Sequence, residues 1–176
     1  MAEAGILHEG DRVELIEGEI VQMAPIGRRH AACVAELTRL LVPAVGQRAL
    51  LWPQNPITLP DDTEPQPDIV LLRPRPDRYL QDDAHPADVL LLIEVADTSQ
   101  RYDRLVKLPL YARAELPEVW IVDLPAELIE VYRRPTASGY AQIERTGRGG
   151  AVAPAAFPDL VLSVDAILVL PAPTGA

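Results

Sequence analysis

Residues 89–96 read Val-Leu-Leu-Leu-Ile-Glu-Val-Ala, an apolar run that carries one carboxylate, Glu94, near its end. An apolar run that is continuous rather than alternating predicts a central strand covered on both faces. A carboxylate inside such a strand is costly unless a partner compensates its charge. The stretch therefore predicts the middle of a sheet and, at Glu94, a functional site.

A second carboxylate begins a second apolar run. Asp68 follows Pro67 and precedes Ile-Val-Leu-Leu at 69–72. If the two strands are neighbours, the carboxylates meet at one end, where their repulsion is on the order of 4 kcal/mol at an effective dielectric constant of about 20. A divalent cation removes this penalty. Mg²⁺ suits the arrangement because it takes few carboxylates, keeps waters and leaves positions for phosphate oxygens.

Lys107 is the only lysine in the chain, and the other fifteen basic residues are arginines. One lysine among so many arginines suggests that this position needs a compact ammonium, for which the wide, planar guanidinium of arginine is no substitute. Together with Asp68 and Glu94, it suggests a metal-dependent phosphodiesterase site. Lys107 would orient the attacking water or offset negative charge in the transition state.

Each of these residues has a structural alternative. Asp68 is also suited to capping a strand end, Glu94 to pairing with an arginine, and Lys107 to a solvated helix surface. His30 lies on the apolar face of a predicted helix, where a core or cleft histidine is commoner than a metal ligand. Asp103 is placed to orient Lys107 at i, i+4, although such pairs commonly decorate surfaces.

Four arginines are candidates for contact with DNA phosphates, with a solubilising role equally open to them: Arg28, Arg29, Arg101 and Arg104.

The composition limits the class of protein. A chain of 176 residues with 48% hydrophobic content predicts a single domain with a sizeable core. The net charge of −10 opposes a nonspecific nucleic-acid coat protein, which is usually basic, but permits a nuclease. Cys33, the only cysteine, excludes an internal disulfide and favours a reducing, cytoplasmic setting. No signal peptide or membrane span is expected, and therefore no membrane partner.

The pattern of apolar and turn residues predicts a mixed sheet with at least two helices. Pro109, inside the second helix, is expected to kink it or to delay its start. Loops are expected over 53–67 and 73–88, and a frayed tail at 171–176. The elements expected along the chain are a hairpin over 12–23 turning at Glu17-Gly18, a helix over 28–42, strands over 68–72 and 89–95, a helix over 99–115, a hairpin over 118–133 and a strand over 140–145.

Four stretches in this order resemble a known family: RVELIEGEIVQMAP (12–25), PQPDIVLL (65–72), LLLIEVADTS (90–99) and RYDRLVKLPLYARAELPEVWIVD (101–123). The chain is similar there to the Uma-two family of restriction-endonuclease-like proteins, within the PD-(D/E)xK nuclease superfamily. The resemblance covers about residues 12–133.

The resemblance implies an α/β fold, with an αβββαβ nuclease core, an N-terminal hairpin and additional C-terminal strands over 134–176. It implies Asp68 and Glu94 as metal ligands, with the backbone carbonyl of Val95 beside them and a further carboxylate from Glu14 or Glu19.

Two features of the pattern bear on the lysine and the histidine. The lysine usual two places after the glutamate is replaced by Ala96, and Lys107 matches a lysine displaced to the following helix. His30 matches a histidine that members carry at the start of the first helix.

The function expected from residues and resemblance together is a Mg²⁺-dependent endonuclease acting on DNA, with Mn²⁺ as a substitute metal. A duplex substrate is favoured, and a homodimer is left open. Two alternatives remain: an inactive nuclease-fold binding module, and a cation-binding β-rich protein with no role on nucleic acid.

Overall fold

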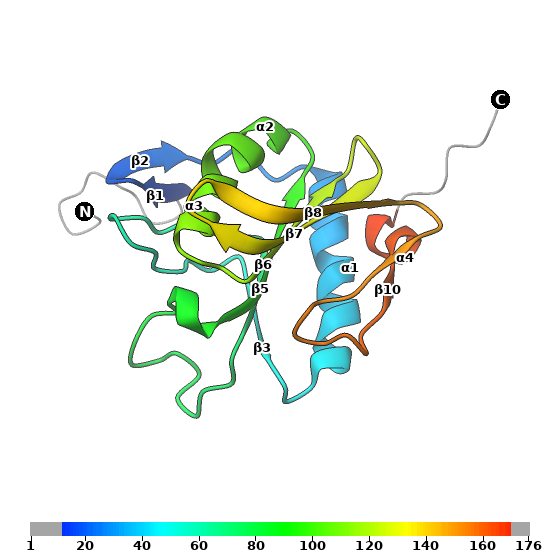
Figure 1. The fold of residues 1–176 in the computed structure, drawn as a ribbon, viewed down its shortest axis with the longest axis horizontal. Helices are drawn as coiled ribbons and strands as arrows, with labels where there is room; N and C mark the ends of the chain where they lie inside the picture. Colours follow the sequence, from blue (N-terminus) through cyan, green and yellow to red (C-terminus); the bar gives the residue numbers. More distant parts are fainter. Residues whose placement is uncertain (1–11, 170–176) are drawn as a thin grey trace.

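In the computed structural model, which describes residues 12–169, a six-stranded mixed sheet forms the centre of the fold (Figure 1). The strands are adjacent in the order β3-β4-β5-β6-β7-β8. Only β5 and β6 run parallel; the other neighbours are antiparallel. The strand bounds are β3 Leu50–Pro53, β4 Ile69–Leu72, β5 Val89–Ala96, β6 Glu118–Asp123, β7 Leu128–Thr136 and β8 Gly139–Gly147.

The chain order of the elements confirms the αβββαβ core. Helix α1 (Arg28–Val45) precedes β3, β4 and β5, and a helical segment over 100–113 carries the chain from β5 to β6. A parallel pair needs such a crossover because the second strand must start at the same edge as the first. The predicted central strand is β5, and its position between β4 and β6 explains its continuous apolar sequence.

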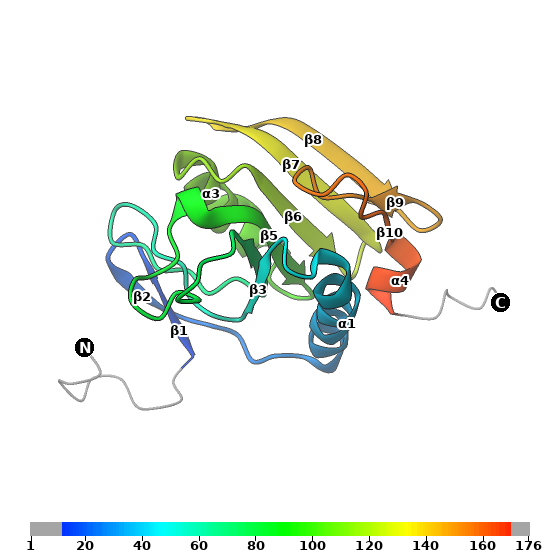
Figure 2. The same ribbon diagram turned by 90° about the horizontal axis from the view of Figure 1, so that it is seen from below.

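The two faces of the sheet are covered by different helices (Figure 2). The face of Ile93 and Val95 packs against buried residues of α1, among them Leu37. The opposite face, that of Leu92, packs with Tyr111 of the second helical segment. Glu94 alternates with Ile93 and Val95 along β5, so its side chain is on the face covered by the second segment.

The predicted N-terminal hairpin is confirmed as β1 (Val13–Ile16) and β2 (Glu19–Gln22), an antiparallel pair outside the main sheet. Glu17 and Gly18 between them have φ of 50° and 81°, the backbone of a two-residue turn that matches strand twist. The 53–67 loop holds the hairpin, since the Gly18 N–H donates to the Asp62 carbonyl at 3.0 Å.

The second helical segment begins with α2 (Gln100–Tyr102), widens into a π-helical turn, η3 (Asp103–Lys107), and continues as α3 (Leu108–Arg113). A π turn immediately precedes Pro109: the Leu108 N–H donates to the Asp103 carbonyl five residues back. Pro109 lies in the first turn of α3, and because it has no N–H it cannot continue the hydrogen bonds of the preceding turn.

Local sequence patterns did not predict the strand β3. The resemblance implied additional strands over 134–176, and the structure has short C-terminal elements there. These are β9 (Ala151–Val152), β10 (Leu162–Ser163) and α4 (Val164–Leu168), which contributes buried side chains beside α1. The loop over 73–88 contains a short 3₁₀ turn, η2 (Pro86–Asp88). The predicted frayed tail lies outside the described residues. Over 12–169, no helix is both long and apolar enough to cross a membrane.

Candidate active site

The antiparallel register of β4 and β5 brings the two predicted carboxylates together. Ile69 is opposite Ile93, so Asp68, one residue before the strand, lies across from Glu94, one residue further along. Opposite positions of an antiparallel pair direct their side chains to the same face. Both carboxylates are buried, with 8% and 4% of their surface exposed.

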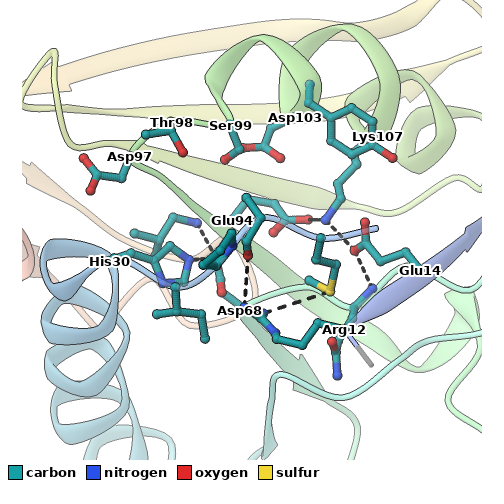
Figure 3. A pocket seen from close by; sticks show the side chains of 18 of the residues that line it. Arg12, Glu14, His30, Asp68, Glu94, Asp97, Thr98, Ser99, Asp103 and Lys107 are labelled. Atoms are coloured by element: carbon teal, nitrogen blue, oxygen red, sulfur yellow. Dashed lines mark hydrogen bonds and ion pairs between the residues drawn. The ribbon is translucent and has the colours of Figure 1, made fainter. Parts of the chain in front are cut away.

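Both carboxylates line a cavity of about 360 Å³. The hairpin forms one wall, and the segment that follows β5 forms another (Figure 3). The charged side chains that line this cavity are the acids Glu14, Asp68, Glu94, Asp97 and Asp103 and the cations Arg12 and Lys107; His30 lines it as well. Every residue predicted to be catalytic therefore faces one common space.

Two donors from the second helical segment hold one oxygen of Glu94. Lys107 Nζ lies 3.1 Å from Oε1, and the Tyr111 hydroxyl donates to the same oxygen at 2.6 Å. Lys107 and Tyr111 are four residues apart, so they project from one face of the helical segment. Within residues 12–169, the other oxygen, Oε2, accepts no hydrogen bond.

Asp68 is held in the same manner. Its Oδ2 accepts from the Val95 backbone N–H at 2.9 Å and lies 2.9 Å from His30 Nε2. Because a carboxylate only accepts, His30 Nε2 carries the proton, and the buried Nδ1 has no hydrogen-bond partner in the described part of the chain. Asp68 Oδ1 has one long contact, 3.5 Å to Gln54 Nε2. Each carboxylate thus has one oxygen held by two groups and one that remains available.

Lys107 bridges the central strand and the hairpin. Its Nζ lies 2.6 Å from Glu14 Oε1, closer than to Glu94, and Glu14 in turn accepts the Gln66 N–H at 2.8 Å. Burial by itself would lower the pKa of Lys107, but the Glu94 and Glu14 carboxylates outweigh burial and raise it above its ordinary value. Of the two glutamates predicted on the hairpin, Glu14 is buried in the site, whereas Glu19 is exposed and lies outside the cavity lining.

Asp103 is buried beside these groups. The Ser99 hydroxyl donates to its carboxylate at 2.6 Å, whereas no hydrogen bond joins Asp103 to Lys107 in the part of the chain described. Burial raises the pKa of Asp103, and the bond from Ser99 and the charge of Lys107 partly offset this effect. Asp103 therefore acts on Lys107 through charge rather than through direct contact.

The site carries an excess of negative charge. Burial raises the pKa of Glu94, with Lys107 opposing the rise and Asp103 and Asp68 adding to it. One buried ammonium does not neutralise four buried carboxylates, those of Glu14, Asp68, Glu94 and Asp103. A cation bound among them would compensate the difference.

The donor set fits a hard divalent cation that keeps part of its water shell. Among the described residues, no group of three or more His, Cys, Asp or Glu side chains is arranged as a complete metal site. Mg²⁺ is commonly held by only one or two carboxylates together with waters and substrate phosphates. The available oxygens of Asp68 and Glu94 match this requirement. The structure shows Val95 contributing its N–H to Asp68, and coordination by its carbonyl stays a prediction.

The four candidate arginines differ in their surroundings. Arg28 and Arg101 are exposed, and their side chains make no hydrogen bond or ion pair within residues 12–169. Arg29 donates to the Leu124 carbonyl at 3.1 Å and lies 3.5 Å from Asp97, a residue of the cavity wall. Arg104 is bound by the buried acids Asp123 and Glu130, at 2.5 and 2.7 Å. This use of its guanidinium favours a structural role for Arg104.

The patterns in the sequence did not single out Tyr111 or Arg12. Tyr111 follows Lys107 by four residues, and this spacing on a predicted helix is a signal that could have revealed it. Arg12 lines the cavity from the start of the hairpin, and nothing in its local sequence distinguishes it from the other arginines.

Comparisons with known proteins agree with this fold. No curated protein matches the chain significantly. A crystal structure described as "a putative nuclease belonging to DUF820" from Anabaena variabilis matches with a TM-score of 0.74 and 18% identity, over 95% of each chain. At this identity the likeness establishes the fold. A model of the Uma2 family, described as "Putative restriction endonuclease", matches residues 2–165, and the chain belongs to that family.

Proposed function

We propose that this protein is a metal-dependent endonuclease that hydrolyses phosphodiester bonds in DNA. The observation that carries the proposal is the pairing of Asp68 and Glu94 across β4 and β5, each with one available oxygen, next to the buried ammonium of Lys107. The family and the fold support a nuclease. The metal, the substrate and the roles of the residues are the proposed part.

Asp68 Oδ1 and Glu94 Oε2 would hold Mg²⁺ or Mn²⁺, with the Val95 carbonyl as a further ligand. When bound, the ion would stabilise the negative charge on the phosphate and lower the pKa of a coordinated water. His30 and the Val95 N–H keep the Asp68 carboxylate in place, since both bind the oxygen that is not offered to the metal.

Lys107 would act as a fixed positive charge. Its raised pKa keeps it protonated, so it is a donor and not a general base. Preorganised donors and charges at the reacting phosphate contribute because they need no reorganisation during the reaction. Glu14 holds this ammonium at the cavity wall from the hairpin side.

The substrate would reach the site past the exposed arginines. Arg28 follows Gly27 of the cavity wall, and Arg101 lies between the lining residues Ser99 and Tyr102. Guanidinium groups suit phosphate oxygens because their donors form a fixed fork. A protein of net charge −10 needs such local basic residues to approach DNA.

A cleavage assay tests the proposal. Supercoiled plasmid and single-stranded DNA are incubated with the protein in Mg²⁺, in Mn²⁺ and in EDTA. We expect products only with metal, and at least a hundredfold less from Asp68→Asn and Glu94→Gln. The control, Asp83→Asn, changes an exposed acid outside the cavity lining and should cleave at the native rate. Metal-independent cleavage, or native rates in both site variants, would contradict the proposal.

The form of the plasmid product reports the assembly. Nicked circles would indicate one strand cut per encounter, by a single site. Linear molecules formed without a nicked intermediate would indicate two sites acting together, the result expected of a homodimer on duplex DNA.

A further inference from the structure

Tyr111 is a buried residue that contacts Glu94, a proposed metal ligand, from outside the cavity. Its side chain is 1% exposed and belongs to the apolar cluster between the sheet and α3. Its hydroxyl donates to Glu94 Oε1 at 2.6 Å. Tyr111 itself does not line the cavity. It is therefore placed to act through Glu94 and not on a substrate.

Glu94 needs a second donor because Lys107 is shared. The ammonium lies closer to Glu14, at 2.6 Å, than to Glu94, at 3.1 Å. A lysine also has a long, flexible stem, whereas a tyrosine has two side-chain torsions and is fixed here by core packing. Of the two groups that orient the Glu94 carboxylate, Lys107 and Tyr111, the Tyr111 hydroxyl is thus the more rigid.

A second buried tyrosine provides the contrast. The Tyr132 hydroxyl donates to Glu130 Oε2 at 2.7 Å, and Tyr132 is 4% exposed. Glu130, however, also binds Arg104 through Oε2 and Arg145 through Oε1, so neither oxygen is left for a ligand. In Glu94, both donors share Oε1, whereas Oε2 accepts no hydrogen bond from the described residues, and Glu94 lines the cavity.

We propose that Tyr111 is a positioning residue: with Lys107 it fixes Oε1 of Glu94, so that Oε2 is presented to a divalent cation in the cavity. The inference rests on the proposed metal site and adds to it a residue outside the cavity. Groups that orient a metal ligand commonly contribute a factor of about 10 to 100 in metal affinity or activity.

The test compares Tyr111→Phe with Tyr132→Phe. Each change removes one buried hydroxyl that donates to a carboxylate, so the two variants should lose similar stability. Calorimetric titration of the metal-free proteins with Mn²⁺ measures affinity without any need for cleavage. We expect Tyr111→Phe to bind Mn²⁺ at least about tenfold more weakly than the wild type. Tyr132→Phe should bind with native affinity, and DNA cleavage should follow the same order, through kcat more than KM.

The possible outcomes separate this inference from the proposed function. Equal Mn²⁺ affinity in the two variants and the wild type would overturn the role of Tyr111 and leave the nuclease proposal intact. Mn²⁺ binding that depends on Tyr111, without cleavage of any DNA, would support the positioning role and contradict the nuclease. A wild type that binds no Mn²⁺ would overturn both.

A measurement on the wild type covers the case in which Tyr111→Phe does not fold. In a crystal soaked with Mn²⁺, the ion should be bonded to Glu94 Oε2, with the Tyr111 hydroxyl still on Oε1. An ion bonded to Oε1 in place of the tyrosine would contradict the inference.

Discussion

At the scale of single residues, Lys107 shows how burial and charge define a role. It is 4% exposed and lies between Glu14 and Glu94, which supply the opposite charge that its burial requires. The sequence pointed to this lysine because it is the only one in the chain. The structure excludes the solvated alternative, since the ammonium is buried in the cavity wall.

Lys107→Arg should lower cleavage by at least about tenfold, a loss of roughly 1.4 kcal/mol of transition-state stabilisation. The guanidinium keeps the charge, but its wide, planar fork does not reproduce the compact ammonium that lies between the Glu14 and Glu94 carboxylates. Initial rates on plasmid, normalised to circular dichroism of the folded variant, measure the effect. Native cleavage by the arginine variant would show that only the charge at this position matters.

Glu14→Gln should reduce cleavage by about tenfold or more, because a neutral amide no longer balances the ammonium. Glu19→Gln removes a charge from the same hairpin at an exposed position outside the cavity lining, and should leave the rate unchanged. Parallel rate measurements distinguish the two glutamates. Equal losses in both would mean that the hairpin acts through its overall charge.

Cys33 offers a test that is independent of activity. Burial first, then the charges of Asp68 and Glu36, raise the pKa of this thiol to about 12, and Sγ donates to the Ile167 carbonyl at 3.3 Å. Between about pH 9 and 12 the folded chain keeps a proton that the unfolded chain has lost, so this thiol's contribution to stability falls with rising pH. Iodoacetamide at pH 8 should label Cys33 only in denaturant, as mass spectrometry can show. Rapid labelling of the native protein would contradict its burial.

At the scale of elements, the π turn and the hairpin together place Lys107. Pro109 lacks a backbone N–H, and the helix widens in the turn immediately before it, over Asp103–Lys107. π turns of this kind are frequent at functional sites. The hairpin supplies Glu14 from the other side, so the ammonium is held between two elements that are far apart in the sequence.

Gly18→Ala should destabilise the protein by roughly 1–2 kcal/mol, since Gly18 has φ of +81° and a side chain there is strained. A Cβ at this position would meet nothing within 4 Å, so the backbone alone carries the effect. The control is Gly147→Ala. At Gly147 φ is not positive, and an added Cβ would meet its nearest neighbour, the Glu127 carbonyl oxygen, at 3.8 Å. Urea unfolding of both variants measures the difference. Equal stability would mean that the turn relaxes without cost.

At the scale of the whole molecule, buried acids set a balance between stability and function. The chain carries 26 acidic and 16 basic residues, and several acids are confined to one cavity. Confining like charges is unfavourable in the metal-free protein and becomes favourable when a cation binds. Stability and metal binding should therefore be linked.

Mn²⁺ at a hundred times its dissociation constant should stabilise the fold by about 2.7 kcal/mol. For a chain of this size, that corresponds to a rise in Tm of about 5–10 °C. Asp68→Asn should abolish the rise, and it should make the metal-free protein no less stable, because one of the repelling charges is gone. Differential scanning fluorimetry with and without Mn²⁺ checks both statements. A Tm unaffected by millimolar metal would support a purely structural role for these acids.

The sequence by itself determined the elements whose period or turn chemistry is local: the hairpin at Glu17-Gly18, the first helix and the strands β4 to β8. The order αβββαβ followed from the family resemblance. The sequence also drew attention to Asp68, Glu94 and Lys107, because charged residues beside apolar runs stand out in a linear pattern. Local patterns did not predict the strand β3 or the helix α4. β3 has only four residues, and α4 only five, so neither shows a clear period.

Only the tertiary structure decided which groups meet. The register of β4 and β5 placed Asp68 opposite Glu94, and the π turn aimed Lys107 and Tyr111 at the same oxygen. Glu14 rather than Glu19 reached the lysine because the packing of the hairpin buried one side chain and exposed the other. The physical reason is that strand register, helix placement and burial depend on contacts between residues distant in sequence, which local patterns do not specify.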